Sequence, residues 1–402
     1  LRKPHWDIMK RASRATIQPS VRLLLLLILA GWLAALAASP LRAQAPIRIG
    51  TFLSVTGAGA FLGAPALATL KLYVDLTNAQ GGLLGRRLSL IQYDVGIDTR
   101  AAQTAVRRLI DKDKVDAIIG GSTTGAAMAV IPIIEQSGVP FLALAGSASI
   151  TSPVRKWVFK SSPTERLACA KILADIVKRD IKSIALLSGD DGFGTAMAGH
   201  CRQLAGPMGV TIIADEVYRS RTRRVSRQMQ RIQKKMAGVG ALVNIGFGGT
   251  TAYITQQFRR MKFQVPLYQS HAAANQDFLD LAGPAAEGVR MPVAPLVLLD
   301  RLAPGDPVRP VIAAYNKLYR GRWEVSPSVY GAHAHDAIQI LIAAIRKARS
   351  TNKAALRRTI EGTKGLVGTS GIFKINADDH LGLDVTSLRM AEVRSGAWEP
   401  VD

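Results

Sequence analysis

Two short loops carry the hydroxyl side chains best suited to binding a small molecule. They cover residues 121–124 and 145–149, and each follows an apolar run of the chain. Hydroxyls near the start of a helix suit an anion, because the first N–H groups of a helix lack partners inside it and the helix dipole is positive there. The residues therefore predict a site that holds a carboxylate without reacting with it. Its hydroxyls belong to Ser122, Thr123, Thr124, Ser147 and Ser149.

Other residues whose types suggest chemistry have simpler explanations. His333 and His335 precede Asp336, but residues i and i+2 of a helix point apart, so we expect no metal site there. Asp190 and Asp191 are adjacent acids without an evident nucleophile or base as partner, which is typical of a solvated loop. We therefore expect no catalytic residue, no metal and no cofactor.

The Gly-rich segment 57–63 leaves one enzymatic alternative, a nucleotide-binding α/β protein. The segment follows a predicted strand and precedes a predicted helix, as a dinucleotide-binding loop does. Its last glycine, Gly63, comes one residue late for the G-x-G-x-x-G pattern, and Asp94 is too distant to be the expected ribose-binding acid. The sequence also lacks a P-loop. A binding protein is the simpler interpretation.

The two hydroxyl loops belong to the segment 118–153, which organises the rest of the chain. It predicts a buried strand ending at Gly120, the first loop, a helix, a turn at Ser137-Gly138, a second strand ending near Leu144, and the second loop. Both loops thus follow the carboxyl ends of apolar strands. In an open α/β sheet, that edge is where ligands bind.

Strands and helices alternate from Ile47 to Gln269, which is the pattern of parallel sheets covered by helices on both faces. A length of 402 residues with 48% apolar content suggests two domains. Residues 288–299 are punctuated by proline and predict an extended crossing strand. Residues 371–398 predict a β-hairpin with the turn residues NADDHLG.

The first 45 residues are typical of a secretory signal. A basic start is followed by the apolar run Leu23–Ala38 and by Ala43-Gln44-Ala45, and the run is short for a membrane span. We expect no later run to span a bilayer, so the sequence predicts an exported, soluble, periplasmic protein. Cys169 and Cys201 either pair or stay as free thiols, and their spacing does not decide between the two.

The charge balance is strongly basic, with 52 Lys and Arg against 29 Asp and Glu and a formal net charge of +23. The basic residues are dispersed, apart from one cluster at 219–231, and no nucleic-acid recognition motif accompanies them. We therefore expect no nucleic-acid partner. The charge is better explained by solubility and a general attraction for anions.

Taken in order, these segments resemble a known family. The resemblance is carried by IRIGTFLSVTGAGAFLG, NAQGGLLGRRLSLIQYDVGIDTRAA, GVPFLALAGSASIT, DDGFGTAMA and FLDLAGPAAEGV, and it runs from Ile47 to about Trp398. The chain is similar to type I periplasmic solute-binding proteins of the branched-chain amino acid ABC-transporter family. The resemblance implies an α/β fold with two doubly wound parallel-sheet lobes joined by three crossings, which close on a ligand as a hinge.

The resemblance also implies roles for individual residues. The ligand carboxylate would be held by Thr124, Ala145 and Ser147, in loops that also contain Thr123 and Gly146. The positions that hold an ammonium group in amino-acid-binding relatives align with His271 and Phe247, and neither residue is an anionic acceptor. Other aromatic positions align with Phe193 and with Leu62, which has Phe61 beside it.

These residues favour a solute that has a carboxylate and lacks an ammonium group. A buried ammonium without an acid beside it costs several kcal/mol, whereas phenylalanine faces suit a ring and His271 can donate to a second polar group. An aromatic or other organic acid therefore fits best. Two alternatives stay open, an amino acid as the solute and a sensor that reports to a receptor. The implied partner is an inner-membrane ABC permease, and we expect a monomer.

The resemblance places the boundaries of the parts of the chain. We expect a signal peptide over residues 1–45. The first lobe would contain residues 46–165 and 295–373, and the second lobe residues 166–294 and 374–402.

Overall fold

The computed structural model of this protein describes residues 45–220 and 225–401, together with Ser20. The expected export signal, and with it the basic and apolar segments before Ala45, lies outside the described residues. The two sheets and their helices belong to the unit that begins at Ala45.

The first of two large sheets is entirely parallel, with strand order β2-β1-β3-β4-β5. Helices α2 and α11 pack on one of its faces, and α3 and α4 on the other, as the two hydrophobic clusters of this lobe show. The strands are β1 Ile47–Leu53, β2 Leu88–Asp94, β3 Ala117–Gly120, β4 Phe141–Ala143 and β5 Val158–Lys160. The helices are α2 Ala60–Ala79, α3 Thr99–Asp111, α4 Thr124–Ser137, α11 Val329–Ala348 and α12 Lys353–Glu361.

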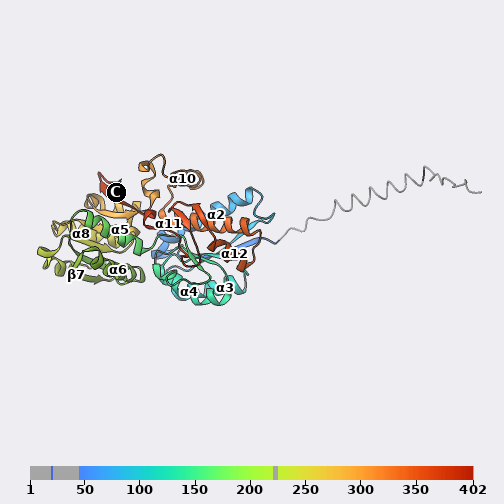
Figure 1. The fold of residues 1–402 in the computed structure, drawn as a ribbon, viewed down its shortest axis with the longest axis horizontal. Coiled ribbons are helices and arrows are strands. Elements are labelled where there is room, and N and C mark those ends of the chain that lie inside the picture. Colours follow the sequence, from blue (N-terminus) through green and yellow to red (C-terminus); the bar gives the residue numbers. More distant parts are fainter. Residues whose placement is uncertain (1–19, 21–44, 221–224, 402) are drawn as a thin grey trace, which may run out of the picture. The chain divides into compact units, whose positions relative to one another are not determined.

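The second sheet has the order β14-β13-β10-β9-β8-β6-β7. Figure 1 shows β7 of this sheet far from α3 and α12 of the first lobe. The strands of the second sheet from β6 to β10 run parallel, whereas β13 and β14 are antiparallel additions at one edge. The strands are β6 Ser183–Gly189, β7 Thr211–Tyr218, β8 Ala241–Ile245, β9 Leu267–Gln269, β10 Arg290–Val293, β13 Arg389–Arg394 and β14 Ala397–Pro400. The helices are α5 Glu165–Lys178, α6 Gly192–Ala205, α7 Ser226–Gln233, α8 Gly249–Arg260, α9 Gln276–Ala282 and α10 Arg309–Trp323.

Helix α3 illustrates why these segments fold as they do. Its buried residues Ala102, Ala105, Val106 and Leu109 recur at helical spacing and face the first sheet. The Asp98 side chain caps the helix by accepting hydrogen bonds from the backbone N–H groups of Arg100 and Ala101, at 2.7 and 3.2 Å. The prediction of two doubly wound α/β lobes is confirmed by this architecture.

The Gly-rich segment folds differently from the sequence prediction. Helix α2 begins at Ala60, so Gly63 lies inside the helix rather than in a loop before it. A Cβ atom at Gly63 would come within 2.3 Å of the Ser54 carbonyl oxygen, so only glycine allows the chain to turn so tightly from β1 into α2. The segment 57–79 is also long and apolar enough to cross a membrane, which contradicts the expectation about later runs, but half of its apolar window is buried in the lobe.

The C-terminal part departs from two further predictions. The prediction of a single hairpin over residues 371–398 is wrong. The structure forms two separate hairpins, β11–β12 (Lys364–Val367 with Ile372–Lys374) and β13–β14. The prediction of an extended segment over residues 288–299 is wrong in its second half, where the chain forms the short 3₁₀ helix Pro295–Arg301 after β10.

The chain crosses between the sheets three times, after β5, after β10 and before β13. Hydrophobic packing changes lobes within α10, where Ile312 belongs to the second core and Tyr315 to the first. Ile375 and Leu383 also pack in the first core. These changes fall beyond the expected boundaries at 295 and 374, so we propose that the first lobe regains the chain near residue 315 and keeps it to about 383.

The two cysteines are bonded to each other. The Cys169–Cys201 disulfide joins α5 to α6, and both residues are buried in the hydrophobic cluster that these helices form with the second sheet. This settles the alternative that spacing left open.

Candidate functional site

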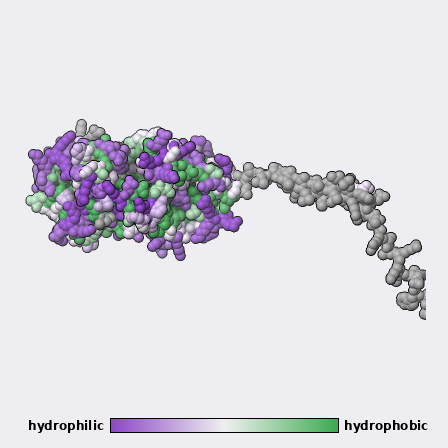
Figure 2. All heavy atoms as spheres, turned by 90° about the horizontal axis from the view of Figure 1, so that it is seen from above, coloured by the Kyte–Doolittle hydropathy of each residue, from purple (hydrophilic) through white to green (hydrophobic). Residues whose placement is uncertain are grey.

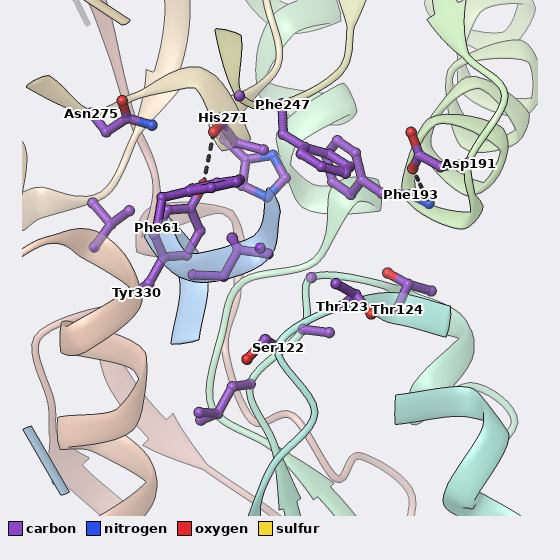
Figure 3. A pocket seen from close by; sticks show the side chains of 18 of the residues that line it. Phe61, Ser122, Thr123, Thr124, Asp191, Phe193, Phe247, His271, Asn275 and Tyr330 are labelled. Atoms are coloured by element: carbon purple, nitrogen blue, oxygen red, sulfur yellow. Dashed lines mark hydrogen bonds between the residues drawn. The ribbon is translucent and has the colours of Figure 1, made fainter. Parts of the chain in front are cut away.

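A cavity of about 840 Å³ lies between loops of the two sheets (Figure 3). The first sheet contributes the loops that follow β3 and β4, and the second contributes the start of α6 and the loops after β8 and β9. Helices α2 and α11 provide further wall. The two hydroxyl loops therefore meet at the predicted edge, and nine of the ten predicted site residues line the cavity: Phe61, Leu62, Thr123, Thr124, Ala145, Gly146, Phe193, Phe247 and His271.

The start of α4 forms a polar part of the wall. Thr123 is the cap of this helix, since its Oγ1 accepts a hydrogen bond from the Ala126 N–H at 3.2 Å. Thr124 is the first helical residue, and its methyl group lies 3.6 Å from where a Cβ at Gly192 of the second lobe would stand. The structure gives the Thr124 hydroxyl no hydrogen-bond partner among the described residues. It is thus available to a ligand, next to the unpaired N–H groups of the helix start.

The second loop contributes backbone rather than a hydroxyl. Ala145 and Gly146 line the cavity, but Ser147 does not and is fully buried. The Ser147 hydroxyl donates to the Glu165 carboxylate at 2.9 Å, and the Ala148 N–H donates to the other carboxylate oxygen at 2.6 Å. A buried carboxylate needs such donors. The Ser147 hydroxyl, which we expected to contact the ligand, is therefore occupied by Glu165. Ser147 thus differs from the other predicted site residues, because its hydroxyl is bonded to Glu165 and does not line the cavity.

A run of aromatic rings lines the apolar side of the cavity. Phe61 of the first lobe lies 6.2 Å from Phe247 of the second, and Phe247 lies 6.0 Å from Phe193. Phe61 is also 5.6 Å from Tyr330, whose hydroxyl donates to the Ala272 carbonyl across the lobes at 2.9 Å. The rings offer flat apolar surface from both lobes, which suits an aromatic or branched body.

Sequence reasoning missed Tyr330 and gave His333 no binding role. Both stand on the first turns of α11, three residues apart, with the rings 6.3 Å from each other. Residues at i and i+3 share a helix face, so the pattern placed them together, but nothing in the sequence showed that this face borders the cavity. His335 points elsewhere, and its Nδ1 lies 2.8 Å from the Asp336 carboxylate.

Two imidazoles and a lysine form the basic groups in and beside the cavity. Burial, together with the charge of nearby Lys160, lowers the pKa of His271 to about 3 and that of His333 to about 4. Both rings are therefore neutral at pH 7. Burial also lowers the pKa of Lys160 to about 7, and its Nζ donates to the Ser162 carbonyl and hydroxyl at 2.7 and 2.8 Å.

The acidic residues at the cavity either accept hydrogen bonds from protein groups or lie exposed at its rim. Asp191 caps α6, with one oxygen accepting from the Phe193 and Gly194 N–H groups at 2.8 and 3.0 Å and the other from the Ser220 hydroxyl. Asp277 and Asp280 line the cavity as exposed residues of α9. The arrangement can hold an acid group and an apolar body reversibly.

Comparison with known proteins identifies the family. Residues 46–397 match the family model described as periplasmic binding protein. A Leu/Ile/Val-binding protein homolog of Brucella abortus is 28% identical over 208 residues, which are 49% of this chain and 51% of that protein. The match spans only about half the length of this curated relative.

Solved structures share the fold over a larger part of the chain. An extracellular ligand-binding receptor from Rhodopseudomonas palustris is 25% identical, with a TM-score of 0.83 over 89% of this chain and 100% of that one. A branched-chain amino acid substrate-binding protein from Streptococcus pneumoniae, solved with isoleucine, is 21% identical, with a TM-score of 0.76 over 89% and 99%. Since the family model covers nearly all of the unit that begins at Ala45, this chain belongs to the periplasmic binding protein family, a family of solute-binding proteins rather than enzymes.

Proposed function

We propose that this protein captures a small carboxylate-bearing solute with an apolar, preferably aromatic, body and no ammonium group. In this role the protein works in the periplasm and delivers the solute to an inner-membrane ABC permease. The observation that carries the proposal is the composition of one cavity wall. The start of α4, with its free Thr124 hydroxyl, lies at the same cavity as the rings of Phe61, Phe193 and Phe247.

The chemistry of the wall matches the two ends of such a solute. A carboxylate gains hydrogen bonds from a hydroxyl and from unpaired backbone N–H groups, and hydrogen bonds to charged groups contribute about 1.5–3 kcal/mol each. A ring gains contact area against the phenylalanines. A cavity of about 840 Å³ lies within the usual size range of ligand pockets.

An amino acid is the second candidate, and one observation favours it. Asp191 lines the same cavity as Thr124, and the Thr124 methyl group lies 3.6 Å from where a Cβ at the neighbouring Gly192 would stand. An ammonium group placed there would have an acid as its neighbour. The two Asp191 oxygens already accept three hydrogen bonds, which is why we place this candidate second.

A matched ligand pair separates the two candidates. 3-Phenylpropionate and phenylalanine differ only in the α-ammonium group, and isothermal titration should show tighter binding of 3-phenylpropionate. In a thermal-shift assay, a ligand at 100 times its Kd should stabilise the protein by about 2.7 kcal/mol. Leucine and isoleucine serve as aliphatic amino-acid controls.

The opposite outcome has its own signature. If phenylalanine or isoleucine binds more tightly and Asp191→Asn removes that preference, the solute is an amino acid. Asp280→Asn, which changes an acid at the rim, is the matched control and should leave the preference unchanged.

A further inference from the structure

Two histidines from opposite lobes line the cavity and have no role in holding the carboxylate described above. His271 follows β9 of the second sheet, and His333 lies on α11 of the first lobe. Nδ1 of His271 is buried without a hydrogen-bond partner. The His333 side chain is only 9% exposed, and its ring nitrogens make no hydrogen bond among the described residues. With Nδ1 enclosed by protein, the neutral His271 ring can carry its proton on Nε2, which has no hydrogen-bond partner among the described residues and is the nitrogen left to a ligand.

The position of these imidazoles differs from that of the α4 start. His271 lies beside the aromatic rings, with Phe193 at 5.6 Å, and its Nε2 is 3.7 Å from where a Cβ at Gly146 would stand. Figure 3 shows Thr123 and Thr124 near Asp191, and His271 between the Phe61–Tyr330 pair and the Phe193–Phe247 pair. A solute with its acid at Thr124 and its ring against the phenylalanines can therefore extend toward the imidazoles.

The charges around the imidazoles favour an acceptor over a cation. The charge of Lys160 helps to lower the pKa of both imidazoles, and the charge of Asp336 acts in the opposite direction on that of His333. The Asp336 oxygens are already occupied by the Thr369 and Ser370 N–H groups, the Thr369 hydroxyl and His335. The Glu165 carboxylate accepts from Ser147 and Ala148. A positive group at the imidazoles would thus lie near the charge of Lys160, while Asp336 and Glu165 are both already hydrogen-bonded to other groups.

We propose that His271 and His333 form a two-imidazole donor site for a second hydrogen-bond-accepting group of the solute, and that this group is a carboxylate. A neutral imidazole has one N–H to donate, and two imidazoles match the two oxygens of a carboxylate. The solute class is then a diacid with an apolar ring between its acid groups. This inference rests on the proposed function, because it takes the first acid to lie at Thr124.

The test uses three ligands that share a ring and a first carboxylate and differ only in the opposite substituent. They are 4-methylbenzoate, benzene-1,4-dicarboxylate and 4-(aminomethyl)benzoate. The corresponding phenylacetates, which are one methylene longer, repeat the comparison for a greater distance between the two end groups. Titration calorimetry should show the dicarboxylate binding at least about tenfold more tightly than the methyl compound, since it gains hydrogen bonds to a charged group. The ammonium compound should bind more weakly than both.

Four variants assign that difference to residues. His271→Phe and His333→Leu should each remove most of the dicarboxylate advantage while binding of 4-methylbenzoate changes by less than about threefold. His200→Gln is the matched control, because His200 lies 3.6 Å from the Glu165 carboxylate but outside the cavity. Thr124→Val should weaken all three ligands alike.

The outcomes separate this inference from the proposed function. Equal binding of the methyl and dicarboxylate ligands to the unaltered protein, or an advantage that survives in both histidine variants, overturns the inference and leaves the proposed function standing. If phenylalanine binds and none of these acids does, the proposed function is overturned and the inference with it. The ligand comparison needs no variant, so a misfolded variant does not block the test.

Discussion

Thr124 and Ser147 show how far single residues could be predicted. Both were expected to contact the solute, because both follow the carboxyl end of a strand. Thr124 lines the cavity, whereas the Ser147 hydroxyl is bound to Glu165, a residue 18 positions further along the chain. A local pattern places a loop at an edge, but it does not reveal which distant buried group takes the loop's side chain. Tyr330 and His333 were missed for a related reason, since only the packed lobes bring α11 to the cavity.

The single-residue variants Thr124→Val and Thr123→Val separate solute binding from helix stability. Thr124→Val keeps the shape of the side chain and removes the hydroxyl, so affinity for an acid solute should fall by about tenfold, the loss of one hydrogen bond to a charge. Thr123→Val removes the cap of α4 instead, so it should lower the free energy of unfolding by about 1 kcal/mol. Calorimetric titration and urea unfolding measure the two effects. Unchanged affinity in Thr124→Val would contradict the proposed acid site.

The elements were largely predictable, and the exceptions have physical causes. Strands such as β1 and β8 are apolar and β-branched, and nearly all their residues are buried, so composition identifies them. The start of α2 was placed too late because Gly63 usually breaks a helix, whereas here it admits the Ser54 backbone. The C-terminal hairpin was misassigned because its two segments pair with different partners, β12 with β11 and β13 with β10.

The disulfide gives a prediction about the pairing of α5 with α6. The two cysteines are separated by 32 residues, so reduction should lower the free energy of unfolding by roughly 4 kcal/mol through the greater freedom of the unfolded chain. Urea unfolding with and without dithiothreitol measures the difference. The double variant Cys169→Ala, Cys201→Ala is the control, since it should show no effect of the reductant. A reductant effect of similar size in that variant would contradict the assignment.

The whole molecule depends on contacts that neither lobe makes alone. The Phe61–Phe247 contact and the hydrogen bond from Tyr330 to the Ala272 carbonyl both join the first lobe to the second. The two-lobe architecture followed from alternating strands and helices in the sequence. The arrangement of the cavity did not, because it depends on how two separately folded sheets face each other.

Closure should therefore be sensitive to Tyr330. Tyr330→Phe keeps the ring contact with Phe61 and removes the bond to Ala272, so the closed arrangement should lose about 1 kcal/mol and solute affinity should fall up to about fivefold. Small-angle X-ray scattering should show a larger radius of gyration without ligand and an unchanged one at saturation. Tyr253→Phe, on α8 outside the cavity, is the control. Identical scattering and affinity would show that the bond does not govern closure.

The bond between Glu165 and the loop at Ser147 has a consequence for the order of events. Glu165 begins α5 immediately after the first crossing between the sheets, and it fastens that crossing to the loop that carries Gly146. Because the loop is tied to a crossing about which the lobes would rotate, we expect it to move less during closure than the distant rim of the cavity. We expect the solute to bind first to the loop that carries Gly146. Movement of the parts of the cavity far from the crossing would then determine how long the solute stays bound.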